Sequence, residues 1–360
     1  MSEPAVPPLF GVHGSLILPR VEILSYNIEL KDEDGGFLGD RASKKALAAI
    51  FDRARKTVAK GGQDPFGDRP SSEIGKSEMD KALAKGDPET AGLIHTVVEE
   101  FAQDFASVVR RLLKEKSWRD VERIVVGGGM RGHRIGELAI GRLSALLKAD
   151  DIDVAIVPIA NDPDDAGLIG AVHLAPDWVF KGHDSILAVD IGGSNMRAGL
   201  VGFDLKKAPR FENAFVVNRE IWCHKDEDKL TREDAVDALI EMLKDMVRKS
   251  HKADARLAPF IGIGCPGVIE PDGSIDRGTQ NLPGNWASSR FNLPQRILAG
   301  IPFIGDQETQ AILHNDAVVQ GLSEIPNMAD VARWGVLTLG TGLGNARFDN
   351  RKLPEPKEKG

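Results

Sequence analysis

The segment SILAVDIGGSNMRAGLVGFD, residues 185–204, contains the pattern that decides the fold. An apolar run leads to Asp190, two glycines follow, and a second apolar run begins after them. This order predicts a β-hairpin with a glycine-rich loop at its tip. Residues 334–349, WGVLTLGTGLGNARFD, repeat the order of strand, glycine turn and strand. The near-repeat indicates two similar halves within one chain.

The rest of the chain alternates between strand and helix patterns. Residues 87–116 give the clearest helix, in which Asp87 suits the N-cap and Pro88 the first turn. Because strands alternate with helices, we expect an α/β fold with a sheet that is at least partly parallel. The other predicted helices are 135–148, 231–250 and 307–324, and the other predicted strands are 15–30, broken at Pro19, then 122–127, 152–159, 260–269 and 301–306.

Composition and charge exclude several classes of protein. The 360 residues are 42% hydrophobic, and the net charge of -8 argues against broad binding to nucleic acid or to anionic membranes. Two cysteines, Cys223 and Cys265, cannot build a disulfide framework or a four-cysteine zinc site. No apolar run is long enough to cross a bilayer, and residues 1–9 lack the features of a signal peptide. We expect a cytoplasmic protein without nucleic-acid or membrane partners.

Two glycine loops carry the main chemical signal. Glycine lets backbone N–H groups point into a concavity and bind phosphate oxygens. A carboxylate at a strand end, such as Asp190, can hold a hydrated Mg²⁺. The alternative is that both loops simply close tight hairpins, since neither has the Walker pattern. The candidate phosphate-binding residues are Gly192, Gly193 and Ser194 in the first loop and Gly340, Thr341 and Gly342 in the second.

Two further segments are candidates for an acceptor site. We expect Asp306 at a junction of strand and helix, where its carboxylate could accept a proton from a hydroxyl group or could cap the helix. Asn315-Asp316 is expected inside that helix and is therefore not a candidate. In residues 262–286, Gly267 allows a close backbone approach and the Asn281 amide can bind sugar hydroxyls, although such loops are often plain turns.

Together these segments resemble the sugar kinases of the ROK family, within the actin-like ATPase superfamily. The combination of six segments, rather than any single one, carries the resemblance. The segments are AVDIGGSNMRAGLV (188–201) for the first phosphate motif, residues 262–286 for the sugar loop, IPFIGD (301–306) for the strand before the catalytic aspartate, LTLGTGLGNA (337–346) for the second phosphate motif, and IVVGGGM (124–130) with DDAGLIGAVHLA (164–175) for the adenosine side.

The resemblance implies an actin-like ATPase (ribonuclease H-like) fold of two domains with a cleft between them. It implies an ATP-dependent, Mg²⁺-requiring phosphotransferase that acts on an alcohol group of a hexose or of a related sugar or polyol. Its general base would be Asp306, which would also contact the sugar together with Gly267 and Asn281. The adenosine contacts would be Gly127, Gly128 and Gly129. The family's zinc motif is absent, so no zinc is expected, and a homodimer remains open as an assembly.

The order of the segments differs from that of the family. There the DIGG segment comes first, whereas here the triple glycine and residues 164–175 precede it. This implies a circularly permuted chain whose former ends are joined through residues 176–184. The expected domains are 1–176 plus 307–360, and 184–306. We also expect residues 4–9 to lie near residues 353–360.

Three departures from the family keep two other functions open. Gly305 stands where an Asn usually precedes the catalytic Asp, and Gly39 replaces the usual sugar-binding Glu. The E-x-G-H motif has no clear counterpart, and His13 is a weak candidate for its histidine. The alternatives are a sugar-responsive regulator of the ROK type and a nucleotide-binding protein without catalytic activity.

Overall fold

The computed structural model describes residues 10–32, 35–227 and 229–352, which divide into two compact units. The expected proximity of residues 4–9 and 353–360 falls outside the described residues. This division groups the described residues of 1–27, 164–176, 307–334 and 346–360 with the DIGGS hairpin, whereas the sequence grouped them with the GTGLG segment. Unit 1 comprises the described parts of Met1–Asn27, Asp164–Trp334 and Ala346–Gly360, and unit 2 those of Ile28–Pro163 and Gly335–Asn345.

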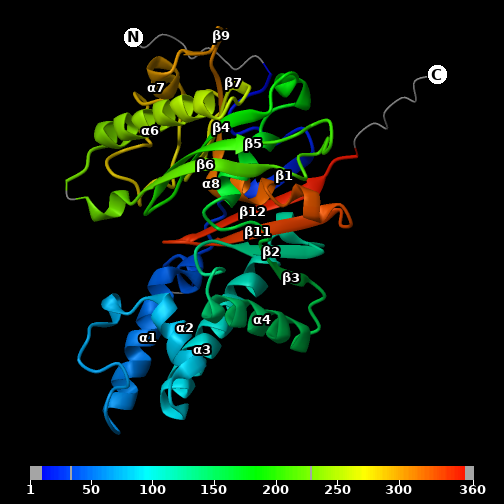
Figure 1. Ribbon diagram of the computed structural model, residues 1–360. Helices are drawn as coiled ribbons and strands as arrows, with labels where there is room; N and C mark the ends of the chain where they lie inside the picture. The colour runs from blue at the N-terminus through cyan, green and yellow to red at the C-terminus, as the bar shows by residue number, and fades with distance from the viewer. Residues whose placement is uncertain (1–9, 33–34, 228, 353–360) are drawn as a thin grey trace. The chain divides into compact units, whose positions relative to one another are not determined.

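Unit 1 contains a five-stranded sheet built around the first predicted hairpin (Figure 1). Its strand order is β10-β7-β4-β5-β6, with β4 and β5 antiparallel and β7 and β10 parallel to β4. The hairpin and the partly parallel sheet are therefore confirmed. The bounds are Ser185–Ile191 for β4, Met196–Gly202 for β5, Phe215–Trp222 for β6, Leu257–Cys265 for β7 and Gln310–Asn315 for β10.

Helices cover both faces of this sheet. Apolar residues of α6 (Arg232–Lys252) and α7 (Leu293–Gly300) form one core with Ile261 and Ile263 of β7. The opposite face of β7 carries Gly262 and Gly264, because side chains alternate along a strand. There α5 (Ala166–Gly170) and α8 (Asp316–Leu322) pack against β4 and β7. A Cβ at Gly262 would lie 2.7 Å from the Ala171 Cβ, so glycine permits this close packing.

The second five-stranded sheet has the order β1-β12-β11-β2-β3. Strand β1 is antiparallel to β12, and β2 is parallel to β3. The division between the units falls inside β11 and β12. If β11, β12, β1, β2 and β3 are numbered 1 to 5, the strand order of this sheet is 3-2-1-4-5. Numbering β4, β5, β6, β7 and β10 in the same way gives the first sheet the same order, read from β6 to β10. The bounds are Val21–Tyr26 for β1, Arg123–Gly127 for β2, Ala155–Pro158 for β3, Arg333–Leu339 for β11 and Leu343–Asn350 for β12.

In the described part of unit 2, three α-helices, α1, α2 and α4, pack against α3. The predicted cap of α3 is confirmed, because the Asp87 side chain accepts a hydrogen bond from the Thr90 N–H. The helices are α1 (Lys44–Ala59), α2 (Lys76–Lys85), α3 (Pro88–Leu112) and α4 (Arg134–Ala149). Short 3-10 helices span Leu38–Ala42, Ser71–Glu73, Lys116–Trp118, Ala171–His173, Asp177–Phe180, His224–Asp226 and Ile325–Met328.

The structure corrects the prediction for residues 301–324. Strands β8 (Phe303–Ile304) and β9 (Gln307–Glu308) form a two-stranded hairpin, and Gly305 takes the left-handed backbone of its turn, with φ of 60°. Residues 310–315 form β10, and the helix begins only at Asp316. The predicted helix over 307–324 is therefore wrong in its first half. A short, continuous run of apolar residues shows no polar–apolar alternation, so its hydrophobic pattern does not distinguish a strand buried on both faces from a buried helix.

Candidate functional site

The DIGGS loop is a fixed turn at the end of a buried strand. All of β4 is buried, and Asp190 is 7% exposed. The Gly192 N–H donates to the Asn195 carbonyl at 2.8 Å, which closes the turn. His224 Nε2 lies 2.9 Å from the Gly192 carbonyl oxygen, within hydrogen-bond distance of the loop. Phosphate binding by Gly192, Gly193 and Ser194 stays a prediction.

Asp190 is held by an arginine from the neighbouring strand. Arg197 Nη1 donates to Asp190 Oδ2 at 3.0 Å, and Arg197 Nη2 donates to Asp164 Oδ1 at 2.7 Å. A Cβ at Gly167 of α5 would lie 2.5 Å from Asp190 Cγ, so only glycine lets α5 cover the carboxylate. Burial raises the pKa of Asp190, and the charge of Arg197 opposes that rise. The arrangement fixes the carboxylate at the foot of the glycine loop.

A second carboxylate, Asp316, lies at the same edge of the sheet. Asp190 pairs with Gly264 of β7, and Gly264 pairs with His314 of β10. Because these three strands are parallel, their carboxyl ends meet at one edge, and Asp316 follows His314 by two positions. Burial raises the pKa of the Asp316 carboxyl to about 7, and the negative charge of Asp190 adds to the rise.

Asn315 ties this edge to the predicted sugar loop. Its side-chain oxygen accepts from the N–H groups of Ala317 at 3.0 Å and Val318 at 3.3 Å, and so caps α8. Its Nδ2 donates to the carbonyl of Gly267 at 3.0 Å. Gly267 is buried, with φ of 115°, a conformation that favours glycine. One amide therefore fixes both the start of α8 and the start of the sugar loop.

Asp306 does not occupy the position that the sequence suggested. It is exposed in the turn of the β8–β9 hairpin, so it ends no strand of the main sheet and caps no helix. The prediction that Asn315-Asp316 lies inside a helix, away from any strand end, is also wrong. Asn315 is the last residue of β10, and Asp316 is the first of α8. The family usually has Asn before the catalytic Asp; Gly305-Asp306 lacks this order and Asn315-Asp316 has it, so the sequence did contain a signal that favoured Asp316.

The sugar loop is braced by residues from β1 and its end. The Tyr26 hydroxyl accepts from the Ile269 N–H at 3.2 Å. Asn27 Nδ2 is buried and has no hydrogen-bond partner among the described residues, and it lies 2.9 Å from where a Cβ of Gly278 would be. Asn281 is exposed in a turn of the same loop. Asn27 carries no recognisable motif, so the sequence did not identify it.

His13 has a structural hydrogen bond. It is 5% exposed, and its Nδ1 accepts from the Leu313 N–H in β10 at 3.0 Å. Burial lowers its pKa to about 4, so the imidazole is neutral near pH 7. The adjacent Gly14 N–H donates to the Leu313 carbonyl at 2.9 Å. These contacts explain the burial of His13 without a role in catalysis.

In unit 2 the triple-glycine turn lies against the strand that leads into GTGLG. Gly128 has φ of 89°, and a Cβ there would overlap the backbone of Leu339. The Gly340 N–H donates to the Gly342 carbonyl at 3.0 Å, and the Gly340 carbonyl accepts from the Lys44 N–H at 3.0 Å. The start of α1 is therefore attached to the GTGLG loop. Nucleotide contacts by Gly127, Gly128, Gly129, Gly340, Thr341 and Gly342 stay predictions.

Two lysines meet at this turn. Lys76 Nζ, at the start of α2, donates to the Gly129 carbonyl at 2.9 Å. Lys44 Nζ, at the start of α1, lies 3.6 Å from where a Cβ of Gly129 would be. Burial lowers the pKa of Lys76 to about 8, and the charge of Lys44 lowers it further, while Asp80 opposes the change. No sequence motif marks either lysine, so both were missed.

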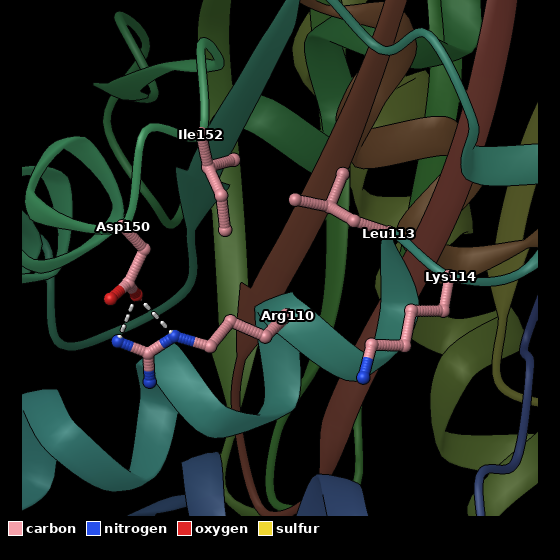
Figure 2. A pocket seen from close by; sticks show the side chains of 5 residues that line it. All are labelled: Arg110, Leu113, Lys114, Asp150 and Ile152. Carbon is pink, nitrogen blue, oxygen red and sulfur yellow. Dashed lines mark hydrogen bonds and ion pairs between the residues drawn. The ribbon is translucent and has the colours of Figure 1, made fainter.

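A separate surface depression lies beside the C-terminal end of α3 (Figure 2). It is lined by Arg110, Leu113, Lys114, Asp150 and Ile152. Arg110 Nε donates to Asp150 Oδ2 at 2.6 Å, so an internal carboxylate already neutralises its guanidinium (Figure 2). The depression contains none of the predicted site residues.

Two features are absent from the part of the chain that the structure describes. Among residues 10–32, 35–227 and 229–352, no three histidine, cysteine or carboxylate side chains gather as a metal cluster. Within the same ranges, no helix has both the length and the apolar character needed to cross a bilayer.

Comparison with known proteins gave partial similarities to solved structures. No protein-family model matches the chain, and no curated protein matches it. A ROK hexokinase from Thermus thermophilus is 19% identical, with a TM-score of 0.34 over 48% of this chain and 49% of that one. An exopolyphosphatase from Cytophaga hutchinsonii is 15% identical, with a TM-score of 0.24 over 46% and 50%. A Ppx/GppA phosphatase from Aquifex aeolicus is 16% identical, with a TM-score of 0.25 over 46% and 51%.

These similarities span about half the length of each solved chain, and they assign no activity to this one. The fold class instead rests on the structure itself. The chain is an α/β protein with two five-stranded sheets of the same strand order.

Proposed function

We propose that this chain is an ATP-dependent phosphotransferase that uses a hydroxyl group of a sugar or polyol as acceptor, with Asp316 as the general base. The position of Asp316 carries the proposal. Asp316 lies at the carboxyl edge of three adjacent parallel strands, the edge at which ligands bind in open α/β sheets. The DIGGS loop begins at the same edge, after β4.

Asp316 has the properties that proton transfer requires. A base is most effective when its pKa is close to the working pH, and the Asp316 carboxyl has a pKa of about 7. Its neighbour Asn315 is bonded to Gly267, which places the base next to the loop assigned to the acceptor. Asn27, with its unpartnered amide, and Asn281 are the proposed donors to sugar hydroxyls in that loop.

The acidic pair also suits a divalent cation. The charge of Asp190 raises the pKa of Asp316, and both carboxylates raise the pKa of the Cys265 thiol; a bound cation would relieve this repulsion. Arg197 already bonds one Asp190 oxygen, which favours Mg²⁺ held through water over a site with several direct carboxylate ligands. When bound, Mg²⁺ would neutralise charge on the phosphates. The DIGGS loop, including Ser194, would donate N–H and hydroxyl groups to the phosphate oxygens.

Acceptor-dependent formation of ADP tests the proposed reaction. The purified protein with ATP and Mg²⁺ would be screened against hexoses, amino sugars and polyols. We expect one acceptor class to raise ADP formation well above the rate without acceptor. Nucleotide binding without turnover on any acceptor would contradict the kinase and favour the nucleotide-binding alternative. Affinity for a sugar without ATP turnover would favour the regulator.

Two matched substitutions test the general base. Asp316→Asn removes the base and should lower kcat by about 10²–10⁴-fold, while the Kd for ATP changes little. Asp306→Asn is the control, because Asp306 is exposed in a hairpin turn, and it should keep near-normal kcat. If Asp306→Asn abolished turnover and Asp316→Asn did not, the assignment of the base would be reversed.

A further inference from the structure

We propose that unit 2 carries a binding site for two linked phosphate groups, formed by Lys44, Lys76 and the triple-glycine turn. The inference deepens the proposed function, and the identification of a nucleotide as occupant rests on that function. The two cations come from the first residues of two different helices and both lie beside Gly129.

The electrostatics of the pair favour an anion. Lys76 Nζ donates to the Gly129 carbonyl, and Lys44 Nζ lies beside the same residue. The charge of Lys44 lowers the pKa of Lys76, so the two ammonium groups repel each other, and partial burial strengthens the repulsion. A phosphate oxygen between them would replace repulsion with two charge-assisted hydrogen bonds. The pair is therefore arranged for a negatively charged ligand.

The nearest carboxylate on the same helix is engaged elsewhere. Asp80 accepts from the backbone N–H groups of Arg134 and Ile135, at 3.1 and 3.0 Å, and its Oδ2 lies 3.2 Å from His133 Nδ1. It therefore caps α4, as a side chain at a helix N-terminus does. The negative charge of Asp80 raises the pKa of Lys76, but the hydrogen bonds of this carboxylate go to the start of α4.

Both glycine turns of unit 2 adjoin the cations. The Lys44 N–H is bonded to the Gly340 carbonyl, which places the start of α1 on the GTGLG loop. A Cβ at Gly342 would meet nothing within 4 Å, so that side of the loop has space for a ligand. Two cations beside two backbone turns fit a diphosphate better than a single phosphate.

Equilibrium binding to the full chain tests the site with ADP, AMP and inorganic pyrophosphate as probes. Lys76→Met and Lys44→Met should each raise the Kd for ADP at least tenfold. Lys45→Met is the matched control, because Lys45 is the exposed neighbour of Lys44, and it should leave the Kd unchanged. AMP, with one phosphate, should bind more weakly than ADP and respond less to the substitutions.

The two phosphate sources separate in the same assay. Lysine-dependent binding of ADP but not of pyrophosphate identifies a nucleotide, and equal lysine-dependent binding of both identifies the diphosphate itself. Unchanged affinity of Lys76→Met for both probes would overturn the proposal. Because burial penalises its charge, Lys76→Met should also raise Tm, which excludes misfolding as the cause of weaker binding. Binding needs no acceptor, so lysine-dependent binding without any turnover would refute the kinase and leave this site standing.

Discussion

Arg197 is the side chain on which the buried charge of Asp190 depends. Replacing it in Arg197→Met leaves the buried carboxylate of Asp190 without its cation. Breaking a buried ion pair in this way costs about 3–5 kcal/mol, measurable by urea unfolding. The double variant Asp190→Asn, Arg197→Met removes both charges and should recover part of that loss. An unchanged unfolding midpoint for Arg197→Met would show that the pair is not needed for stability.

The raised pKa of Asp316 makes stability depend on pH. The folded protein keeps a proton on this carboxyl up to about pH 7, whereas the unfolded chain loses it near pH 4. The folded state therefore binds more protons in this range, and the free energy of unfolding falls as pH rises from 4 to 7. Relative to Asp316→Asn, the loss should be on the order of 2–4 kcal/mol.

The same titration sets the activity profile. As a base, Asp316 acts only when deprotonated, so kcat should fall as pH drops below 7. The exposed Asp306 provides the comparison, and Asp306→Asn should show the same profile as the unaltered protein. A kcat that stays constant between pH 5 and 8 would contradict the role of Asp316.

Single residues were predicted from sequence only where a pattern marked them. Asp190 follows an apolar strand and precedes two glycines, and the structure places it at the strand end as expected. Lys44 and Lys76 begin two separate helices, and nothing local shows that tertiary packing brings their ammonium groups together. Asp316 was not selected because the strand that precedes it, β10, was interpreted as part of a helix.

Among the elements, the turn after β2 depends on one glycine. Gly128→Ala would place a Cβ against the backbone of Leu339 at φ of 89°. We expect a loss of about 2–4 kcal/mol, from left-handed strain and displaced backbone. Gly129→Ala is the control, because its nearest neighbour would be Lys44 Nζ at 3.6 Å, and its loss should be smaller. Equal unfolding midpoints for the two variants would contradict this account.

Element prediction succeeded where length or local chemistry was distinctive. Helix α3 has a long apolar stripe and a capping aspartate, and α6 has the expected capping box at Thr231 and Asp234. Strand β10 failed because six residues cannot establish a period, and both of its faces are covered. The hairpin β8–β9 failed because its pairing covers two residues on each side, too few to produce a pattern.

For the whole chain, the two sheets share one strand order, but their strands are distributed differently. The first sheet uses β4, β5, β6, β7 and β10 in sequence, whereas the second begins at β11 and β12 and continues with β1, β2 and β3. We propose on this basis that the chain is a circular permutant. The shared strand order of the two sheets could not be predicted from the sequence, whereas the changed order of the motifs was visible there.

A reordered chain tests the permutation. It would begin at residue 183, run to the C-terminus, and continue through a flexible linker into the N-terminal residues as far as residue 182. Such a chain keeps every strand neighbour, so it should unfold cooperatively with a similar Tm. A control opened inside β7, at residue 261, should not fold, since that break divides a buried strand. Failure of the first variant alone would argue against the proposal.

The Asn315 amide joins α8 to the carbonyl of Gly267, so under the proposed function the first turn of that helix should report acceptor binding. If a bound sugar moves the loop, the Asn315 side chain must either move with the Gly267 carbonyl or lose its hydrogen bond to it. In both cases the hydrogen bonds from the N–H groups of Ala317 and Val318 to the Asn315 side chain should change. Deuterium uptake at these two positions would then record occupancy even in a variant that cannot transfer phosphate.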